Sequence, residues 1–242
     1  MKLLKFIFLC VSLLIVVTSI TVLLVSFNII DSRDCYNTEN TSVTNLVKNS
    51  DDNISVSTKE SIPINLKIAV VSIEDERFYD HKGVDFKRSI AATFSYIINK
   101  GDSEFGGSTI TQQLIKNTTK DDNRKWTRKV REWVRAIYIE SKLSKDQILT
   151  EYLNCIYLGN SNYGVNKASL NYFNKDLDKL NLSECAMIAA MIQTPEATNV
   201  FNGNEEIKNL NERKNIVLDK MLELKKITEV EHDNAIKYNF KR

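Results

Sequence analysis

The sequence predicts a mainly α-helical fold preceded by an N-terminal transmembrane helix. The chain of 242 residues contains only 7 glycines and 2 prolines, the residues that most often interrupt helices. Apolar residues recur at intervals of three and four through its body, whereas the alternation of apolar and polar residues typical of a half-buried strand is missing. A long apolar run at the start supplies the transmembrane part of the prediction.

Residues 3–30 are almost wholly apolar or small, and about 20 such residues suffice for a helix to cross a bilayer. Lys2 and Lys5 lie at the start of the run, so the positive-inside rule predicts a cytoplasmic N-terminus and an extracytoplasmic body. A cleaved signal peptide is the alternative, with an apolar region of about 7–15 residues and a small-x-small site after it. The length of the run and the lack of such a site favour a retained signal anchor over residues 1–30.

Residues 31–60 are rich in Asn, Ser, Thr and Asp and show little apolar periodicity, which predicts a juxtamembrane linker. Residues 61–242 then form one domain. The net charge of only +2 gives no general signal for binding a polyanion, and we expect no nucleic-acid partner.

The four cysteines show neither CxxC spacing nor histidine neighbours, so they do not predict a metal site. Cys10 falls within the apolar run. A disulfide between Cys155 and Cys185 and two separate buried thiols both remain open.

Helices follow one another along the body in the order expected from the apolar spacing. They are predicted over residues 66–78, 86–98, from 110 onward, 126–137, 145–158, 166–173, 182–192 and 207–224. Asp121, Asp122 and Asn123 offer an N-cap for the fourth of them. That helix carries an apolar stripe, formed by Trp126, Val130, Trp133, Val134 and Ile137, with Arg128, Glu132 and Arg135 on the opposite face.

The stretch Gly106–Asn117 carries the strongest chemical signal in the chain. It is small, polar and rich in amides, and Glu74 and Glu132 lie on either side of it in the sequence. Glycines let a backbone approach a ligand and turn its N–H groups toward an anion, and hydroxyls and side-chain amides suit sugar or phosphate oxygens. One carboxylate on each side indicates acid/base chemistry on a glycan.

Residues 74–85, Glu-Asp-Glu-Arg-Phe-Tyr-Asp-His-Lys-Gly-Val-Asp, resemble the first motif of the peptidoglycan glycosyltransferases, the family that includes the glycosyltransferase domains of class A penicillin-binding proteins. Residues 107–117, 128–132, 145–154 and 163–173 resemble the motifs that follow, in the family's order. The chain contains neither a Ser-x-x-Lys tetrad nor Lys-Thr-Gly, the marks of a transpeptidase, so it resembles a monofunctional member.

This resemblance implies a mainly helical, lysozyme-like domain that polymerises lipid II into glycan strands with inversion at the anomeric carbon. It implies that Glu74 is the general base and that Glu132 is a second essential carboxylate, which positions the pyrophosphate or a divalent ion. Sugar and phosphate oxygens are expected to bind to Ser108, Thr111, Gln112, Gln113, Lys116, Arg124, Arg128 and Arg131.

Taken without the resemblance, these residues have plainer interpretations. Glu74 is then a surface carboxylate at a helix end, and Glu132 an ion-pair partner of Arg128 one turn earlier. The run from Lys116 to Arg135 is then a solvated basic helix face.

Other motif residues are expected to support the structure. Asp75 fixes loop geometry by capping, and His81 is a turn residue. Tyr152, Asn154 and Tyr172 are assigned to the fold.

The chain departs from the family pattern at a few positions. Thr150 stands where the fourth motif often has Glu, and Asn166 and Lys167 replace the commoner Glu-Ala-like pair of the fifth. A second proline after Pro195 is missing. These departures concern the outer wall of the cleft.

Two rival functions remain. A muramidase or lytic transglycosylase cuts the same polymer but has no use for a basic pyrophosphate cradle, and an inactive membrane-anchored scaffold would not need both carboxylates. The expected partners are lipid II, the growing lipid-linked strand, the membrane, and proteins of cell-wall synthesis or division. No organic cofactor is expected; a divalent cation, Mg²⁺ or Mn²⁺, at Glu132 stays open. The expected location is the cell membrane, with the catalytic domain outside.

Overall fold

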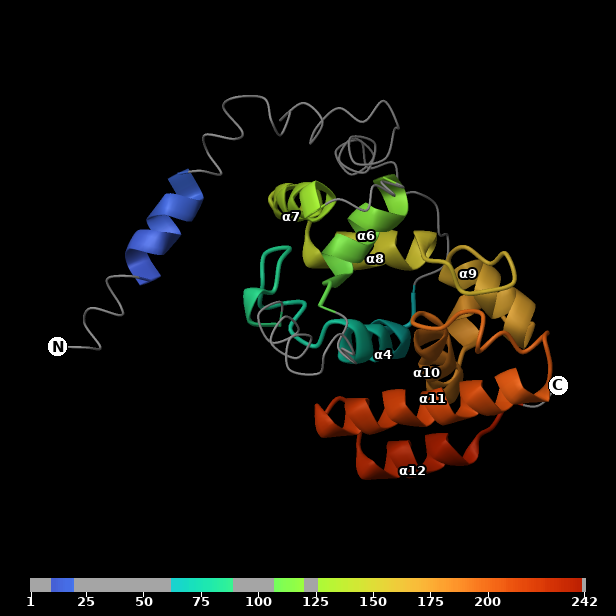
Figure 1. Cartoon of the computed structure of the whole chain (residues 1–242). Helices are drawn as coiled ribbons and strands as arrows, with labels where there is room; N and C mark the ends of the chain where they lie inside the picture. The colour runs from blue at the N-terminus through green and yellow to red at the C-terminus, as the bar shows by residue number, and fades with distance from the viewer. Residues whose placement is uncertain (1–9, 20–61, 89–106, 120–125, 241–242) are drawn as a thin grey trace.

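The computed structural model describes residues 10–19, 62–88, 107–119 and 126–240, and these residues are mainly helical (Figure 1). The only β-type pairing in these ranges is an isolated antiparallel bridge between Tyr157 and Tyr163. The prediction of a mainly α-helical domain is therefore confirmed for the described part of the chain.

The predicted helices occur in the predicted order with shifted ends, and the structure adds the short 3-10 helix η2 (Leu177–Lys179) and α12 (Glu229–Lys237), which were not predicted. In chain order, these helices are α4 (Ile64–Glu74), α6 (Ile110–Thr119), α7 (Trp126–Glu140), α8 (Lys145–Cys155), α9 (Val165–Ala168) with the π-helical η1 (Ser169–Phe173), η2, α10 (Leu182–Met191), α11 (Asn204–Glu223) and α12. The helix predicted over residues 66–78 ends at Glu74, since residues 76–80 form turns. Residues 86–88 are helical, and the rest of the helix predicted over 86–98 lies outside the described residues.

Three of the described helices begin with a capping box, in which each of two residues accepts, through its side chain, a hydrogen bond from the backbone N–H group of the other. The pairs are Ser144 with Gln147 at α8, Asn181 with Glu184 at α10, and Thr228 with Glu231 at α12. These boxes satisfy N–H groups of the first turn that have no partner within the helix, so the local sequence sets where each helix begins.

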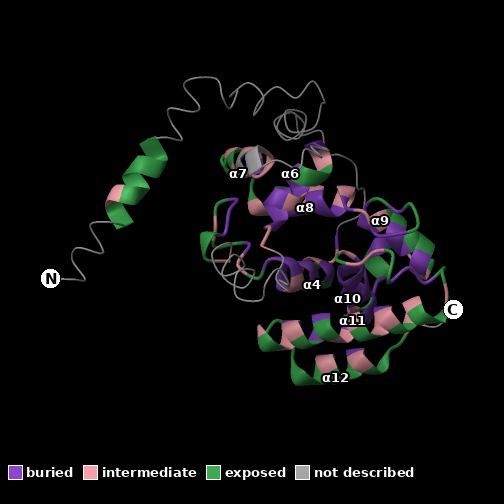
Figure 2. Cartoon of the chain, in the orientation of Figure 1, coloured by how far each residue is buried: buried purple, intermediate pink, exposed green. Residues whose placement is uncertain are grey.

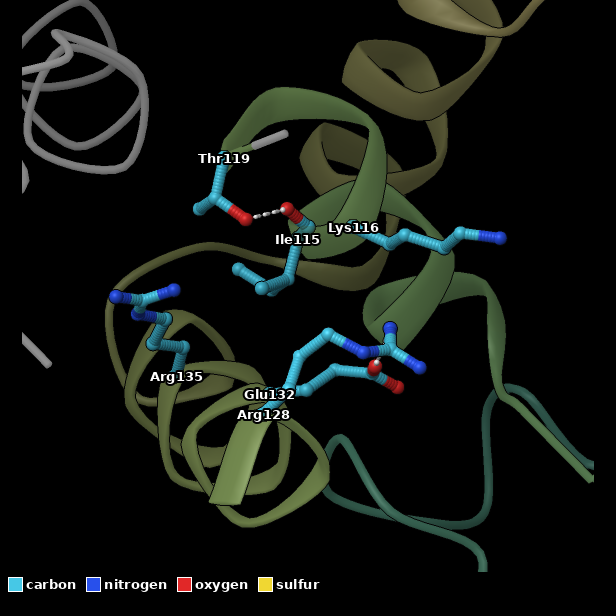
Figure 3. A pocket seen from close by; sticks show the side chains of 6 residues that line it. All are labelled: Ile115, Lys116, Thr119, Arg128, Glu132 and Arg135. Atoms are coloured by element: carbon cyan, nitrogen blue, oxygen red, sulfur yellow. Dashed lines mark hydrogen bonds and ion pairs between the residues drawn. The ribbon is translucent and has the colours of Figure 1, made fainter. Parts of the chain in front are cut away.

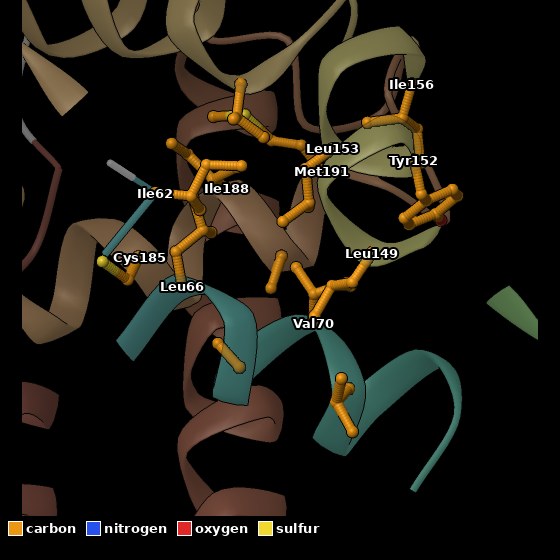
Figure 4. Close-up of a cluster of buried hydrophobic side chains, with 14 of the residues drawn as sticks. Ile62, Leu66, Val70, Leu149, Tyr152, Leu153, Ile156, Cys185, Ile188 and Met191 are labelled. Carbon is orange, nitrogen blue, oxygen red and sulfur yellow. The ribbon is translucent and has the colours of Figure 1, made fainter. Parts of the chain in front are cut away.

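The core lies where α10 packs against α4, α11 and α12, while α6 packs against α7 and α8 (Figures 1 and 2). Every residue of α10 after Leu182 is buried, as expected for its small and apolar sequence. Side chains from α4, α8 and α10 meet in one cluster, which includes Leu66, Val70, Leu149, Leu153, Ile188 and Met191 (Figure 4). This cluster fixes the end of α4 relative to α8.

Helix α7 buries two charged residues alongside Ala136 and Ile139, and it leaves part of its predicted apolar stripe exposed. Glu132 is 5% exposed and Arg135 is 4% exposed, whereas Val134 is 38% and Ile137 is 47% exposed. The solvated basic face that is the plain interpretation of this run is therefore wrong for Glu132 and Arg135. Burial of charged groups requires partners, and α7 directs them toward α6.

The predicted anchor over residues 1–30 lies outside the described residues except for residues 10–19, which are helical. In the described ranges, no helix combines the length and the apolar character needed to cross a bilayer. The retained anchor, the linker over residues 31–60 and the cap at residues 121–123 therefore stay predictions. Cys155 and Cys185 are free thiols, so the disulfide alternative is wrong.

Gly83 brings the loop after α4 into direct contact with α7. Its φ of +87° favours glycine, and a Cβ atom there would lie 2.7 Å from the backbone carbon and oxygen of Ala136. The carbonyl of Gly83 also accepts a hydrogen bond of 2.7 Å from the Thr109 hydroxyl. Because residue 83 has no side chain, the loop after α4 can contact both α7 and the start of α6.

We expect Gly83→Ala to destabilise the domain by more than about 2 kcal/mol, because it adds both backbone strain and a clash with α7. Urea denaturation of the two proteins measures the loss. Lys82→Ala, at the exposed neighbouring position, is the control and is expected to change stability by less than about 0.5 kcal/mol. Equal stability of Gly83→Ala and the parent protein would refute the close approach.

Lys214 holds the end of α12 against α11. Its side chain is buried, and its ammonium group donates to the carbonyls of Ala235 at 3.4 Å, Ile236 at 3.0 Å and Tyr238. These carbonyls belong to the last turn of α12 and the residue after it, where most carbonyls lack a partner within the helix; that of Ala235 also accepts from the Tyr238 N–H and the Ser183 hydroxyl.

Replacing Lys214 by Met removes the side-chain donor to the part-buried carbonyls of Ile236 and Tyr238, so we expect a loss of about 1–3 kcal/mol in the free energy of unfolding. Thermal unfolding followed by circular dichroism measures the change. Lys208→Met, on an exposed position of α11 whose ammonium lies 3.7 Å from Glu212, is the matched control with little expected effect. A loss no greater than that of the control would contradict this role for Lys214.

Candidate active site

Glu74 is the last residue of α4, and its carboxylate is buried at the side of α6. The residue is 5% exposed, and its Oε2 accepts a hydrogen bond of 2.7 Å from the Gln113 amide of α6. No described residue makes a hydrogen bond to the other oxygen, Oε1. The plain interpretation of Glu74 as a surface carboxylate is therefore wrong.

Burial is the largest influence on the ionisation of Glu74 and raises its pKa. The Gln113 hydrogen bond, the charge of Arg88, the nearby Gln193 amide and the charge of Arg213 lower the pKa in part. A buried carboxylate of raised pKa can take up a proton more readily than an exposed one, which is the property a general base needs.

Gln193 and Arg213 approach Glu74 from the side of α10 and α11. The Arg213 guanidinium donates to the Gln193 side-chain oxygen at 2.6 Å and, from Nε, to the carbonyl of Ala190 at 3.4 Å. These bonds hold the guanidinium at the end of α10. The pair therefore places a positive charge and an amide on the opposite side of Glu74 from α6.

Asp75 connects the end of α4 to the start of α6. Its Oδ2 accepts the backbone N–H of Ile110 at 3.0 Å and lies 2.9 Å from Nε2 of His81. Arg88 lies 4.0 Å from Asp75 Oδ1 and also donates to the backbone carbonyl of Glu74. The capping role expected for Asp75 is confirmed, and His81 lies in the turn region, bonded to Asp75.

The second carboxylate, Glu132, lies on the inward side of α7 among cations. Arg128 is 3.5 Å from Glu132 Oε2, one turn earlier, and Lys129 contacts Glu132 Oε1. Lys129 also donates to the Ser108 hydroxyl at 3.0 Å, which ties α7 to the residues before α6. The ion pair between Arg128 and Glu132 therefore exists, within a larger cationic cluster.

A small hollow opens between α6 and α7 beside this cluster (Figure 3). It is lined by Ile115, Lys116, Thr119, Arg128, Glu132 and Arg135. Lys116 is exposed, and the guanidinium of Arg128 lies beside the Glu132 carboxylate. Positive side chains line this hollow, which has room for about one water molecule, and positive charge of this kind attracts an anionic group such as a phosphate.

The predicted binding residues do not all lie at one place: some are near Glu132, one is bonded to Glu74, and others are buried. Lys116, Arg128 and Ser108 lie on the Glu132 side, Gln113 is bonded to Glu74, and Arg131 is half-buried on α7. Thr111 and Gln112 are buried: Thr111 donates to Glu140 at 2.6 Å, and Gln112 accepts the Thr109 N–H at 2.8 Å. Arg124 lies outside the described residues. Helix α6 therefore contributes a residue to each carboxylate's surroundings: Gln113 to Glu74 and Lys116 to the hollow beside Glu132.

Sequence reasoning missed five residues near the carboxylates: Arg88, Lys129, Tyr152, Gln193 and Arg213. Lys129 is three residues before Glu132, a helical spacing that signals contact. Tyr152, assigned to the fold, is fully buried, and its hydroxyl donates to Gln113 at 2.8 Å. Gln193 and Arg213 gave no local signal, because only the packing of α10 and α11 on α4 brings them to Glu74.

The residues around Glu132 do not fit a resident divalent ion. Each of its oxygens already faces a cation, Lys129 or Arg128. Within the described ranges, no three His, Cys, Asp or Glu side chains gather as a metal site. A divalent ion at Glu132 stays an untested prediction.

Comparison with known proteins places this geometry in a family. A family model described as "Transglycosylase" matches residues 39–222. Penicillin-binding protein 1A of Clostridium tetani is 44% identical over 185 residues, which cover 74% of this chain and 23% of that protein. The protein of the same name from Clostridium perfringens is 43% identical over 183 residues, covering 73% and 27%.

Among solved structures, the crystal structure of penicillin-binding protein 1A from Haemophilus influenzae matches with a TM-score of 0.42 and 24% identity, covering 77% of this chain and 17% of that chain. The chain thus spans about a quarter of the length of the curated relatives named above. The extent of the family match, residues 39–222, is decisive: this chain belongs to the transglycosylase family.

Proposed function

We propose that this domain polymerises lipid II into β-1,4-linked peptidoglycan strands at the outer face of the cytoplasmic membrane and releases undecaprenyl pyrophosphate. The observation that carries the proposal is that one helix, α6, contacts both a buried carboxylate, Glu74, and the hollow beside a second carboxylate, Glu132, which lies inside a cationic cluster. Membership of the transglycosylase family supports it.

In the proposed reaction, the 4-hydroxyl of one disaccharide attacks the anomeric carbon of the other. A bond forms between that oxygen and the carbon, and the bond from the carbon to the pyrophosphate oxygen breaks, which inverts the configuration. Glu74 takes the proton of the attacking hydroxyl, on the oxygen Oε1 that has no hydrogen-bond partner among the described residues.

The leaving pyrophosphate carries the negative charge that develops as the bond breaks. Lys116, Arg128 and Lys129 stabilise this charge, and Glu132 holds Arg128 and Lys129 in place. Ser108 helps to hold Lys129, and Arg131 adds positive charge on α7. The cations therefore act on the donor and Glu74 on the acceptor.

The cationic hollow favours synthesis over cleavage. A muramidase needs an acid for the leaving sugar oxygen, whereas positive charge around Glu132 serves a leaving group that departs as an anion. The proposal concerns the matched segment, anchored to the cell membrane through residues 1–30 and working with proteins of cell-wall synthesis or division.

Glu74→Gln is expected to lower the rate of lipid II polymerisation by about 10²–10⁴-fold, because the amide cannot accept the proton. Gel analysis of labelled glycan chains measures the rate. Glu76→Gln is the matched control, since Glu76 is half-exposed and bonds to Lys220 at 3.0 Å instead. Undiminished polymer with Glu74→Gln would refute the base, and cleavage of preformed glycan without polymer formation would refute synthesis.

The raised pKa of Glu74 also links activity to stability. A carboxyl whose pKa is raised by folding destabilises the folded state at pH values above its folded pKa, and this penalty vanishes below the ordinary pKa of 4.5. We therefore expect Glu74→Gln to be more stable than the parent protein at pH 7, and equally stable below pH 4.5.

Chemical denaturation of both proteins between pH 4 and pH 8 measures this difference. Glu76→Gln again serves as the control and is expected to show no such gain. A variant Glu74→Gln that is less stable than the parent protein at pH 7 would contradict the burial penalty.

A further inference from the structure

Three side chains form a continuous line of hydrogen bonds from the centre of α8 to the proposed base. The Tyr152 hydroxyl donates to the Gln113 side-chain oxygen at 2.8 Å, and the Gln113 amide nitrogen donates to Glu74 Oε2 at 2.7 Å. The line runs from α8 through α6 to the end of α4, so each helix contributes one member.

A primary amide presents an acceptor on one side and donors on the other, so its orientation decides what Glu74 faces. With the oxygen of Gln113 turned toward Tyr152, the N–H donors face the carboxylate. With the amide reversed, its oxygen would face the Glu74 carboxylate and would favour the protonated form. Gln113 is half-buried, and its own packing does not distinguish the two nearly isosteric orientations.

Tyr152 can fix the orientation of the Gln113 amide. It is completely buried in the cluster of Figure 4, so its ring is fixed by packing. Burial, followed by the nearby charge of Glu74, raises its pKa well above the ordinary value, which keeps the hydroxyl protonated. A protonated phenol next to an amide donates to the amide oxygen.

We propose that Tyr152 is a positioning residue for glycosyl transfer: its hydroxyl fixes the orientation of the Gln113 amide, so that the amide donates to the Glu74 carboxylate. The inference rests on the proposed function, in which ionised Glu74 is the general base. Tyr152 itself touches neither substrate nor reacting atoms, and it acts only through Gln113.

Other groups also face Glu74 and set the background for this effect. Arg88 and Arg213 carry the positive charges that act on it, from the helical turn after the loop and from α11. Asp75, the next residue, is paired with His81, and Gln193 contributes an amide from the end of α10. None of these contacts depends on the Tyr152 hydroxyl. Removing that hydroxyl therefore shows how much the hydrogen bonds from Tyr152 through Gln113 affect the ionisation of Glu74.

The test compares the pH dependence of kcat and KM for lipid II polymerisation in the full chain with Tyr152→Phe, Gln113→Ala and the double variant. We expect Tyr152→Phe to move the acid limb of kcat upward by about one pH unit, because Glu74 loses a fixed donor. KM is expected to stay within about twofold, since the hydroxyl does not contact substrate. In the Gln113→Ala background, Tyr152→Phe is expected to cause no further shift.

Tyr172→Phe is the matched control. Tyr172 is also buried, and its hydroxyl donates to the Leu158 carbonyl at 2.9 Å, in a loop that does not contain either carboxylate. It loses a buried hydrogen bond of the same kind, so a general loss of stability would appear in both variants. Its acid limb is expected to coincide with that of the parent protein.

Incorporation of 3-fluorotyrosine at position 152 provides a second variant that keeps the ring and its packing. Its more acidic hydroxyl donates more strongly, and the acid limb is expected to move downward. An unmoved limb in this variant, or in a folded Tyr152→Phe, would overturn the inference. So would an equal shift in Tyr172→Phe, or a full further shift in the Gln113→Ala background.

The two proposals fail differently. If Glu74→Gln keeps its polymerase activity, the proposed base is wrong and the acid limb has another origin. If Glu74→Gln is inactive but Tyr152→Phe leaves the acid limb of kcat unchanged, only the positioning role is wrong.

Discussion

Burial of the Glu74 carboxylate is the constraint on which the rest of the site depends. A buried carboxylate needs donors, and Gln113 can supply one only if α6 is fixed beside the end of α4. Asp75 fixes it by capping the Ile110 N–H, and Thr109 adds a bond to the Gly83 carbonyl. The motif residues around Glu74 thus hold α6 in register with it.

The same helix contributes to two electrostatic environments. Glu74 is desolvated and has an amide hydrogen bond from Gln113, whereas Glu132 lies among Arg128 and Lys129, with Lys116 lining the hollow beside it. The burial of charged residues on α7 follows from this arrangement, because buried charges of opposite sign have to be paired. Acceptance of a proton and stabilisation of a leaving anion require such different surroundings, so one helix serves both halves of the proposed reaction.

Local signals in the sequence were sufficient for most of the helices. The apolar spacing and the small residues of α10 predict elements that the structure contains, whereas α12 was not predicted. The direction of α7 could not be predicted, because its apolar stripe is indistinguishable in sequence from a core-facing one. Gln193, Arg213 and the role of Tyr152 depend on contacts between distant segments, and a single sequence does not encode those contacts in its local pattern.

The most direct test of the account is the titration of the Glu74 carboxyl itself, observed by ¹³C NMR of side-chain-labelled protein and assigned with Glu74→Gln. We expect a pKa above the ordinary value of 4.5 that coincides with the acid limb of lipid II polymerisation. A carboxyl that titrates at or below 4.5, or an acid limb that lies at a different pH, would contradict the claim that buried Glu74 is the general base.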